Sequence, residues 1–145
     1  MTKKITIAVD AMGGENAPEK TIEGVKLFLK NNQSHDDFII NLFGDKKRIE
    51  EKLEKENIDR TNLKITHTDS IVADDETPLT AIKNSKNTSM WNCISSQVNG
   101  DSDISLSAGN TGVLLVVSRM ILKMMDDVSK PALAGLWPNN KNTNV

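Results

Sequence analysis

The chain has 145 residues, and its balance of 37% hydrophobic and 26% charged residues is that of a globular domain with a sizeable core. A formal net charge of -2, with lysines and glutamates interspersed, argues against nucleic acid as a partner. The single cysteine excludes an internal disulfide, and the chain begins without the apolar run of a signal peptide. Its longest apolar stretch is far short of the roughly 20 residues that cross a bilayer. We therefore expect a cytoplasmic chain.

Two strand-helix units open the chain. Ile5–Val9 alternates β-branched residues and predicts a strand, and after a glycine turn Pro18 suits the first position of a helix. Phe38–Phe43 predicts a buried strand, and Asp45 is a candidate N-cap for the helix that follows. The helical residues expected to turn inward are Ile22, Val25, Leu29, Ile49 and Leu53.

The middle of the chain predicts a third strand and two further helical segments. Leu63–Thr68 has the composition of a strand, and Thr77 with Pro78 predicts the start of helical turns that reach Lys83. A second helical spacing follows until Asn99-Gly100 breaks it. Its apolar positions are Met90, Ile94 and Val98.

The last third of the chain predicts a strand, a helix and a short fifth strand. Ile104–Leu106 is the strand, the helix starts at Val113 and is expected to end because of Pro131, and Ala132–Trp137 is the candidate fifth strand. The apolar helical positions are Val113, Val116, Val117, Met120, Leu122 and Met124.

This alternation predicts an α/β protein with a three-layer α-β-α, Rossmann-like fold, in which helices cover both faces of a mostly parallel sheet. Ligands in such sheets bind beyond the carboxyl ends of the strands, where glycine loops 10–14 and 107–112 are expected to lie. The polar tail 138–145 has no closing helix or strand. We therefore expect an incomplete sheet with an open edge, and interpret residues 1–145 as part of a longer single domain that is truncated near 138–145.

The loop Ser107–Gly112 is the main candidate site. Backbone N–H groups and small hydroxyls at a helix N-terminus suit an anion, so Gly109, Asn110, Thr111 and Gly112 are hypothesised to hold one there. A capped tight turn without a ligand is the alternative. In the first loop, Gly13-Gly14 indicates either close backbone approach to a substrate or a turn with positive φ.

Several charged residues near the loops have two interpretations. Asp10, at the end of a strand, suits orientation of a donor or proton transfer, but also a plain hydrogen bond to loop amides. Lys83 and Lys86, spaced i and i+3, can supply positive charge for phosphate or form a solvated helix face. Asp75-Glu76 is explained by entry into a helix, and no metal site is implied.

The remaining reactive side chains favour structural roles. His67 is expected to make a structural hydrogen bond and His35 to be solvated, while Cys93 is expected to be a small core residue. The cluster Met120, Met124 and Met125 indicates core or subunit contact rather than an acyl groove. These positions provide no Ser-His-Asp or Cys-His arrangement for nucleophilic catalysis.

An ordered set of motifs extends over essentially the whole chain: Val9–Gly14 with Ala17–Glu19, Asp75–Pro78 followed by Lys86 and Ser89-Met90, Ser107–Gly112, and Lys130–Ala134. This set resembles one enzyme family, the phosphate acyltransferase of bacterial fatty acid and phospholipid synthesis. The resemblance implies transfer of a long acyl chain from acyl carrier protein to inorganic phosphate. It also implies that the full-length protein is a homodimer attached peripherally to membranes, and that this chain is only its N-terminal portion.

For such a reaction phosphate is itself the nucleophile, so the protein supplies an anion site, donors for the thioester oxyanion, and orientation. The resemblance implies no cofactor and no metal. Trp137 and the tail Asn139–Asn142 depart from the family pattern. The candidate catalytic residues are Asp10, Asn110 and Thr111, and the candidate residues for phosphate or substrate are Gly13, Gly14, Lys83, Lys86, Ser107, Gly109 and Gly112.

Three alternative functions are open at this point. A short-chain phosphate acetyl- or butyryltransferase would share the phosphate chemistry but accept coenzyme A thioesters. An inactive binding fragment would retain the loops and lack half of the cleft. A nucleotide-binding Rossmann module is the third, but it would need a G-x-G-x-x-G run after the first strand, which is absent.

Overall fold

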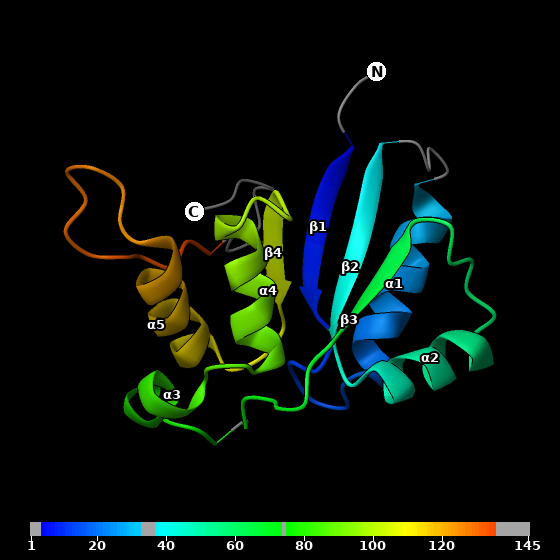
Figure 1. The fold of residues 1–145 in the computed structure, drawn as a ribbon, viewed down its shortest axis with the longest axis horizontal. Coiled ribbons are helices and arrows are strands. Elements are labelled where there is room, and N and C mark those ends of the chain that lie inside the picture. Colours follow the sequence, from blue (N-terminus) through cyan, green and yellow to red (C-terminus); the bar gives the residue numbers. More distant parts are fainter. Residues whose placement is uncertain (1–3, 33–36, 74, 136–145) are drawn as a thin grey trace, which may run out of the picture.

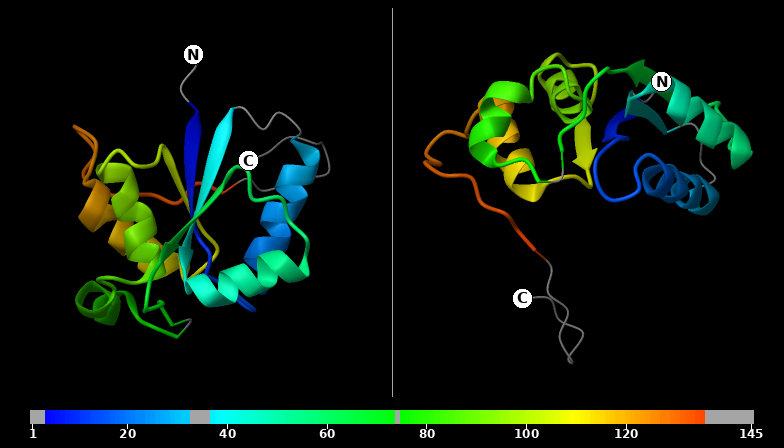
Figure 2. Two further views of the ribbon diagram at one scale, coloured as in Figure 1. Left: turned by 45° about the vertical axis from the view of Figure 1, so that its right-hand side comes forward. Right: turned by 90° about the horizontal axis from the view of Figure 1, so that it is seen from below.

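The computed structural model describes residues 4–32, 37–73 and 75–135, and these form an α/β fold around a four-stranded, all-parallel sheet of order β3-β2-β1-β4 (Figure 1). Helices α1 and α2 cover one face, and α4 covers the other with α5 and α3 beside it (Figure 2). The predicted three-layer fold and parallel sheet are confirmed. In chain order the elements are β1 (Ile5–Asp10), α1 (Glu19–Asn31), β2 (Phe38–Gly44), α2 (Lys46–Lys55), β3 (Leu63–His67), α3 (Pro78–Asn84), α4 (Ser89–Val98), β4 (Ile104–Ser107) and α5 (Thr111–Leu122).

The larger core lies between the sheet and helices α1 and α2. In the parallel register Ile7 lies beside Ile40 and Ile104, and Val9 beside Leu42 and Leu106, so one face of the sheet is apolar throughout. The two helices present their apolar stripes to this face, as predicted. Ile22, Val25, Ile49 and Leu53 are buried in this core, and Leu29 packs against it.

The second core joins the helices of the other face. Met90 and Ile94 of α4 pack with Ala81 of α3 and with Val113 and Val117 of α5. A small third cluster holds Cys93, Ala8 and Phe43 under α4, which confirms Cys93 as a core residue. Burial, together with the nearby Asp10 charge, raises the pKa of the Cys93 thiol to about 12, so this cysteine is an inert side chain.

Local capping explains where two helices begin. The Asp45 carboxylate accepts a hydrogen bond from the Arg48 amide at 3.2 Å and caps α2. Thr77 and Thr80 form a capping box, with Pro78 as the first residue of α3. Both starts agree with the sequence prediction. Pro18 differs by one position, because it is the N-cap of α1 rather than its first residue.

The predicted end of the second helical segment is confirmed, because α4 ends at Val98, just before Asn99-Gly100. Two predictions for the last third of the chain are wrong. Helix α5 ends at Leu122, well before Pro131, because Lys123 takes a positive φ of 65° and leaves the helical conformation. Met124 therefore lies outside the helix. Met120 and Met125 are exposed at 43% and 81%, so they are not core residues, and a subunit contact at these positions stays a prediction.

The predicted fifth strand is also not formed in the part that the structure describes. Residues 131–135 are irregular, and β4 pairs only with β1 in the described sheet. A strand needs the backbone hydrogen bonds of a neighbour, and these residues do not pair with β4. The rest of that prediction, at 136–137, and the polar tail 138–145 lie outside the described residues. No described helix is long and apolar enough to cross a membrane.

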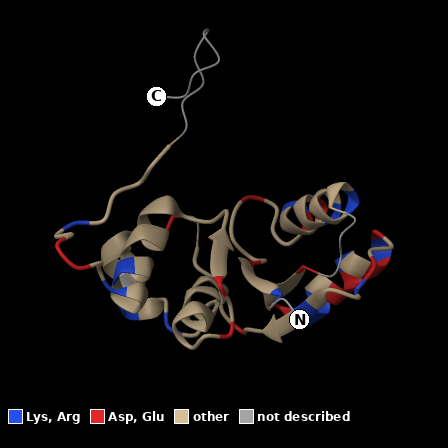
Figure 3. Cartoon of the chain, turned by 90° about the horizontal axis from the view of Figure 1, so that it is seen from above, with Lys and Arg blue, Asp and Glu red and all other residues tan. Residues whose placement is uncertain are grey.

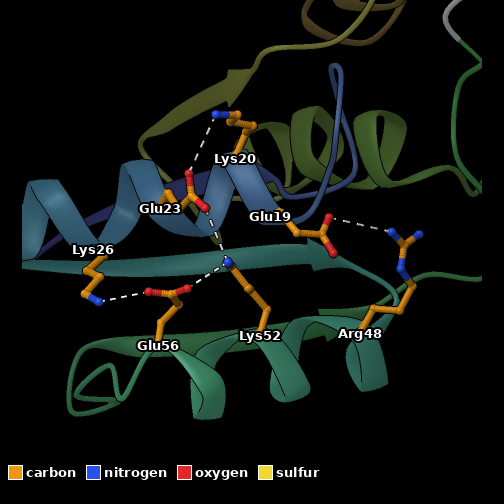
Figure 4. Close-up of polar contacts among 7 residues, drawn as sticks. All are labelled: Glu19, Lys20, Glu23, Lys26, Arg48, Lys52 and Glu56. Carbon is orange, nitrogen blue, oxygen red and sulfur yellow. Dashed lines mark hydrogen bonds and ion pairs between the residues drawn. The ribbon is translucent and has the colours of Figure 1, made fainter.

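A network of ion pairs joins α1 to α2 (Figure 4). The Lys52 ammonium lies 2.8 Å from Glu56 and 3.3 Å from Glu23, and the Lys26 ammonium lies 2.9 Å from the other Glu56 oxygen. The Lys52 side chain is only 11% exposed, so its charge is the least hydrated of the group. Glu56 joins both lysines and is the centre of the network.

Replacing Glu56 with Gln should remove one source of acid sensitivity. Hydrogen bonds from Lys52 and Lys26 lower the pKa of the Glu56 carboxyl from 4.5 to about 2. Because the folded pKa is the lower one, the stabilisation is present above pH 4.5 and is lost as the pH falls toward about 2. We expect Glu56→Gln to flatten this part of the acid dependence of urea unfolding. Glu51→Gln, the same charge change at an exposed position of α2, is the control; an unchanged dependence in Glu56→Gln would contradict the role of the pair.

Candidate functional site

The candidate site lies where the strand order of the sheet reverses. From β1 the chain adds β2 and then β3 on one side, and then crosses to place β4 on the other side of β1. In open parallel sheets, ligands bind beyond the carboxyl ends of the strands at such a switch point. Loops 10–14 and 107–112 leave the carboxyl ends of β1 and β4, so both occupy this place (Figure 1).

The two loops touch through glycine backbone and a short chain of hydrogen bonds. The Gly109 N–H donates to Ser107 Oγ at 3.1 Å, and the Ser107 hydroxyl donates to Asp10 Oδ2 at 2.7 Å. A Cβ on Gly13 would lie 2.6 Å from that Asp10 oxygen and 2.9 Å from the Gly109 nitrogen. The predicted convergence of the two loops is therefore confirmed, and close approach explains Gly13.

Gly14 meets one of its two proposed requirements, a turn with positive φ, and it also lies close to the second loop; approach of a substrate stays a prediction. Its φ of +91° is one that side chains of L-residues rarely adopt, and a Cβ there would lie 2.7 Å from the Ala108 carbonyl oxygen. Gly13 and Gly14 together let the first loop lie against the second without any side chain between them.

A cavity of about 330 Å³ opens between the loops and the start of α1. Lys20, in the first turn of α1, places a cation at this cavity, and sequence reasoning missed it. The available signal was its position in the first turn of the helix that follows the glycine loop. Its nearest ionic partner is Glu23, at 3.9 Å. The cavity is lined by Val9, Asp10, Gly13, Gly14, Glu15, Lys20, Thr21, Leu106, Ser107 and Ala108.

Asp10 is the buried charge of the site, with only 1% of its surface exposed. Burial raises the pKa of its carboxyl, while hydrogen bonds from Ser89, Ser107 and the backbone of Met12 and Gly13 act in the opposite direction. The Met12 N–H donates to Oδ1 at 3.3 Å. Because one oxygen accepts from a loop amide and the other from Ser107, Asp10 orients both loops, which fits positioning better than attack on a substrate.

Asn110, Thr111 and Gly112 begin α5 beside α3 and lie outside the cavity lining. Asn110 Oδ1 accepts from the Val113 amide at 3.1 Å, and its Nδ2 donates to the Glu76 carbonyl at 3.0 Å. A Cβ on Gly112 would lie 3.2 Å from Pro78 Cγ, so this glycine serves packing of α5 on α3. Thr111 is exposed. A direct role of these residues toward an anion stays a prediction.

The two candidate lysines do not share a helix face. Lys83 lies in α3, which ends at Asn84, and Lys86 lies in the turn that follows, so the predicted helical spacing is wrong. Both side chains are exposed. Lys20 is the cation that lines the cavity between the glycine loops.

The described histidine has a structural role, as expected. His67 Nδ1 accepts from the Lys46 amide at 3.2 Å, and its Nε2 lies 2.9 Å from Asp69. His35 lies outside the described residues. Within the described ranges, no group of three His, Cys, Asp or Glu side chains is arranged to hold a metal ion.

Comparison with known proteins shows the family to which the chain belongs. A family model described as fatty acid synthesis protein matches residues 5–145. The phosphate acyltransferase of Pelagibacter ubique is 45% identical over 145 residues, which are 100% of this chain and 42% of that protein. Those of Parvibaculum lavamentivorans and Bradyrhizobium diazoefficiens are 37% and 35% identical over 146 residues, 100% of this chain and 40% of each relative. The chain thus spans about two fifths of their length, and it belongs to the fatty acid synthesis protein family.

Proposed function

We propose that this chain is the N-terminal part of an acyltransferase that forms acyl phosphate from fatty acyl-acyl carrier protein and inorganic phosphate in phospholipid synthesis. The observation that supports this most is the meeting of the β1 and β4 loops over a cavity that holds the Lys20 cation. The printed names of the relatives, all phosphate acyltransferases, supply the reaction class. In the full-length protein we expect a homodimer that associates peripherally with membranes.

The proposed reaction needs no nucleophile from the protein. An oxygen of hydrogen phosphate attacks the carbonyl carbon of the thioester, a C–O bond forms, and the C–S bond breaks. The proton of hydrogen phosphate ends on the released thiol, so atoms and charge balance. This chemistry suits a site whose cysteine is inert and whose carboxylate is committed to loop hydrogen bonds.

The residues of this chain would bind and orient phosphate. Lys20 offsets its negative charge from the first turn of α1, a part of the helix that itself favours anions. Asp10 and Ser107 hold the two loops at a fixed separation, so the cavity is formed before phosphate enters.

A thioester competition tests the proposal. The chain is incubated with phosphate and either a long-chain acyl-acyl carrier protein or acetyl-coenzyme A, and acyl phosphate is trapped as the hydroxamate. Product from the long-chain substrate supports the proposal, whereas turnover of acetyl-coenzyme A alone would favour the short-chain enzyme. If neither thioester reacts but titration of inorganic phosphate shifts the resonances of Gly13 and Ser107, the chain is a binding fragment.

Lys20→Ala is the matched variant for the same titration. We expect it to weaken phosphate binding about tenfold, the effect of about 1.4 kcal/mol from one lost charge-assisted contact. Lys30→Ala, at the far end of α1, is the control and should leave the affinity unchanged. Equal affinities of the two variants would exclude Lys20 from the anion site.

A further inference from the structure

One face of the edge strand β4 is uncovered although its residues are apolar. Leu106 is 53% exposed and Ile104 is 45% exposed. Their neighbours across the ladder, Val9 and Ile7, belong to the sheet face that α1 and α2 cover. On this face Val9, Ile40 and Leu42 are buried and Ile7, Leu63 and Ile65 are partly buried, whereas both apolar residues of β4 are exposed.

An open apolar face is unusual for a parallel sheet. Sheets made only of parallel strands are normally covered on both faces, because their residues are apolar on both sides. Here the gap beside α1 forms an apolar cavity of about 220 Å³. It shares Val9, Thr21 and Leu106 with the candidate phosphate cavity, so the two are neighbours. The apolar cavity is lined by Ile7, Val9, Thr21, Gly24, Val25, Phe28, Ile40 and Leu106.

Gly24 in the middle of α1 is a second sign of a missing neighbour. It lines this cavity, and a Cβ there would meet nothing within 4 Å. Glycine inside a helix costs about 1 kcal/mol relative to alanine, and the described structure gives no reason for it. Close approach of another backbone to α1 at this point would explain it.

The course of the chain indicates what fills the gap. Residues 131–135 lie beyond the free edge of β4, in both of the views along the sheet (Figures 2 and 3). Figure 3 also shows acidic and basic residues gathered on α1 and α2, while β4 itself carries none. The Pelagibacter relative has more than half of its length outside the stretch that this chain matches. A segment of the same protein has a higher effective concentration at this face than a free partner, which favours it as the occupant.

We propose that the β4 strip, defined as Phe28, Ile104 and Leu106, is the docking surface for an amphipathic helix from the part of the full-length protein outside these 145 residues. The apolar face of this helix packs on the strip, in the same way as α1 packs on β1 and β2. Its backbone lies close to Gly24. Because the strip adjoins the phosphate cavity, the same helix forms a further wall of the candidate site. The proposal depends on packing alone and is independent of what the cavity binds.

Cysteine accessibility tests this surface. Leu106→Cys is labelled with a maleimide in the chain alone and in a chimera in which this chain replaces the matched stretch of the Pelagibacter protein. Cys93 is 1% exposed with a pKa of about 12 and gives no competing signal. We expect labelling at position 106 to slow at least about tenfold in the chimera, as burial under a stable helix requires. Lys47→Cys, at an exposed position of α2, should react equally in both proteins.

Each result decides the proposal. Equal labelling rates at position 106 would overturn it. Protection of position 106 by dimerisation of the chain alone would also overturn it, since the occupant would then be a second copy. Protection that appears only with an added long-chain fatty acid would overturn it as well. Ile104→Cys repeats the measurement at the second strand position. If the chimera folds with Lys47→Cys but with neither strand variant, the strip is required for assembly, which supports the proposal.

Discussion

Gly13→Ala is expected to lower the free energy of unfolding by about 1–3 kcal/mol and to abolish phosphate binding. The added Cβ would lie 2.6 Å from Asp10 Oδ2, 2.8 Å from Ser107 Oγ and 2.9 Å from the Gly109 nitrogen. One of these atoms belongs to the backbone of the second loop, so rotation of a side chain cannot relieve the overlap. The two loops must separate, and the cavity between them loses its shape.

Gly24→Ala is the matched control for this substitution. It is the same chemical change in a helix where the new Cβ meets nothing within 4 Å, so in the 145-residue chain it should stabilise by up to about 1 kcal/mol. Urea unfolding measures both variants, and phosphate titration measures the site. Gly13→Ala with unchanged stability and affinity would show that the loops do not depend on their close approach.

Asp10→Ala should be the most destabilising change of a single charged residue described here. The carboxylate is 1% exposed and accepts from the Ser107 hydroxyl at 2.7 Å and the Met12 amide at 3.3 Å. Each buried donor that is left without an acceptor costs about 1–3 kcal/mol. Denaturant unfolding of Asp10→Ala checks the sum, with Asp75→Ala at an exposed position as the control. A loss no larger than that of the control would mean that the hydrogen bonds of Asp10 are dispensable.

Asp10→Asn separates the charge from the shape. Burial raises the pKa of Asp10 above 3.8, so the folded state holds the proton more tightly than the unfolded chain. The contribution of this group to stability is therefore greatest below pH 3.8 and falls as the pH rises through the folded pKa, the reverse of the Glu56 case. The stability of the native protein minus that of Asp10→Asn should decline as the pH rises above 3.8 in urea unfolding. A difference that rises with pH would contradict the cause assigned to the shift.

Elements that depend on local chemistry could be predicted from the sequence. The four strands of the sheet begin at the predicted residues, because each coincides with an alternating or continuous apolar run that is buried when the strands pair. The starts of α2 and α3 follow from Asp45 and Thr77, whose side chains bond to amides three residues on. Convergence of the glycine loops was also predictable, since all carboxyl ends of parallel strands meet at one edge of the sheet.

Features set by contacts distant in sequence could not be predicted. Asn110 is a helix cap in either reading, but its bond to the Glu76 carbonyl exists only because α3 packs on α5. Lys20 follows the first glycine loop in the sequence, but its place in the lining of a cavity also depends on the second loop, which comes from β4. Pro131 does not end α5, because the backbone already leaves the helical conformation at Lys123.

The hydrogen bond between Asp10 and Ser107 joins residues separated by 97 positions. In the sheet, β1 lies between β2, which is synthesised early, and β4, which is synthesised late. Pairing of β1 with β2 closes a short loop of chain, whereas pairing of β1 with β4 closes a much longer one and therefore has the greater entropic cost. On a ribosome the first strand therefore remains open along one side until β4 has emerged. The cavity between the glycine loops is consequently among the last parts of the domain to assemble, and a nascent chain that stalls before residue 107 would carry the first core without this cavity.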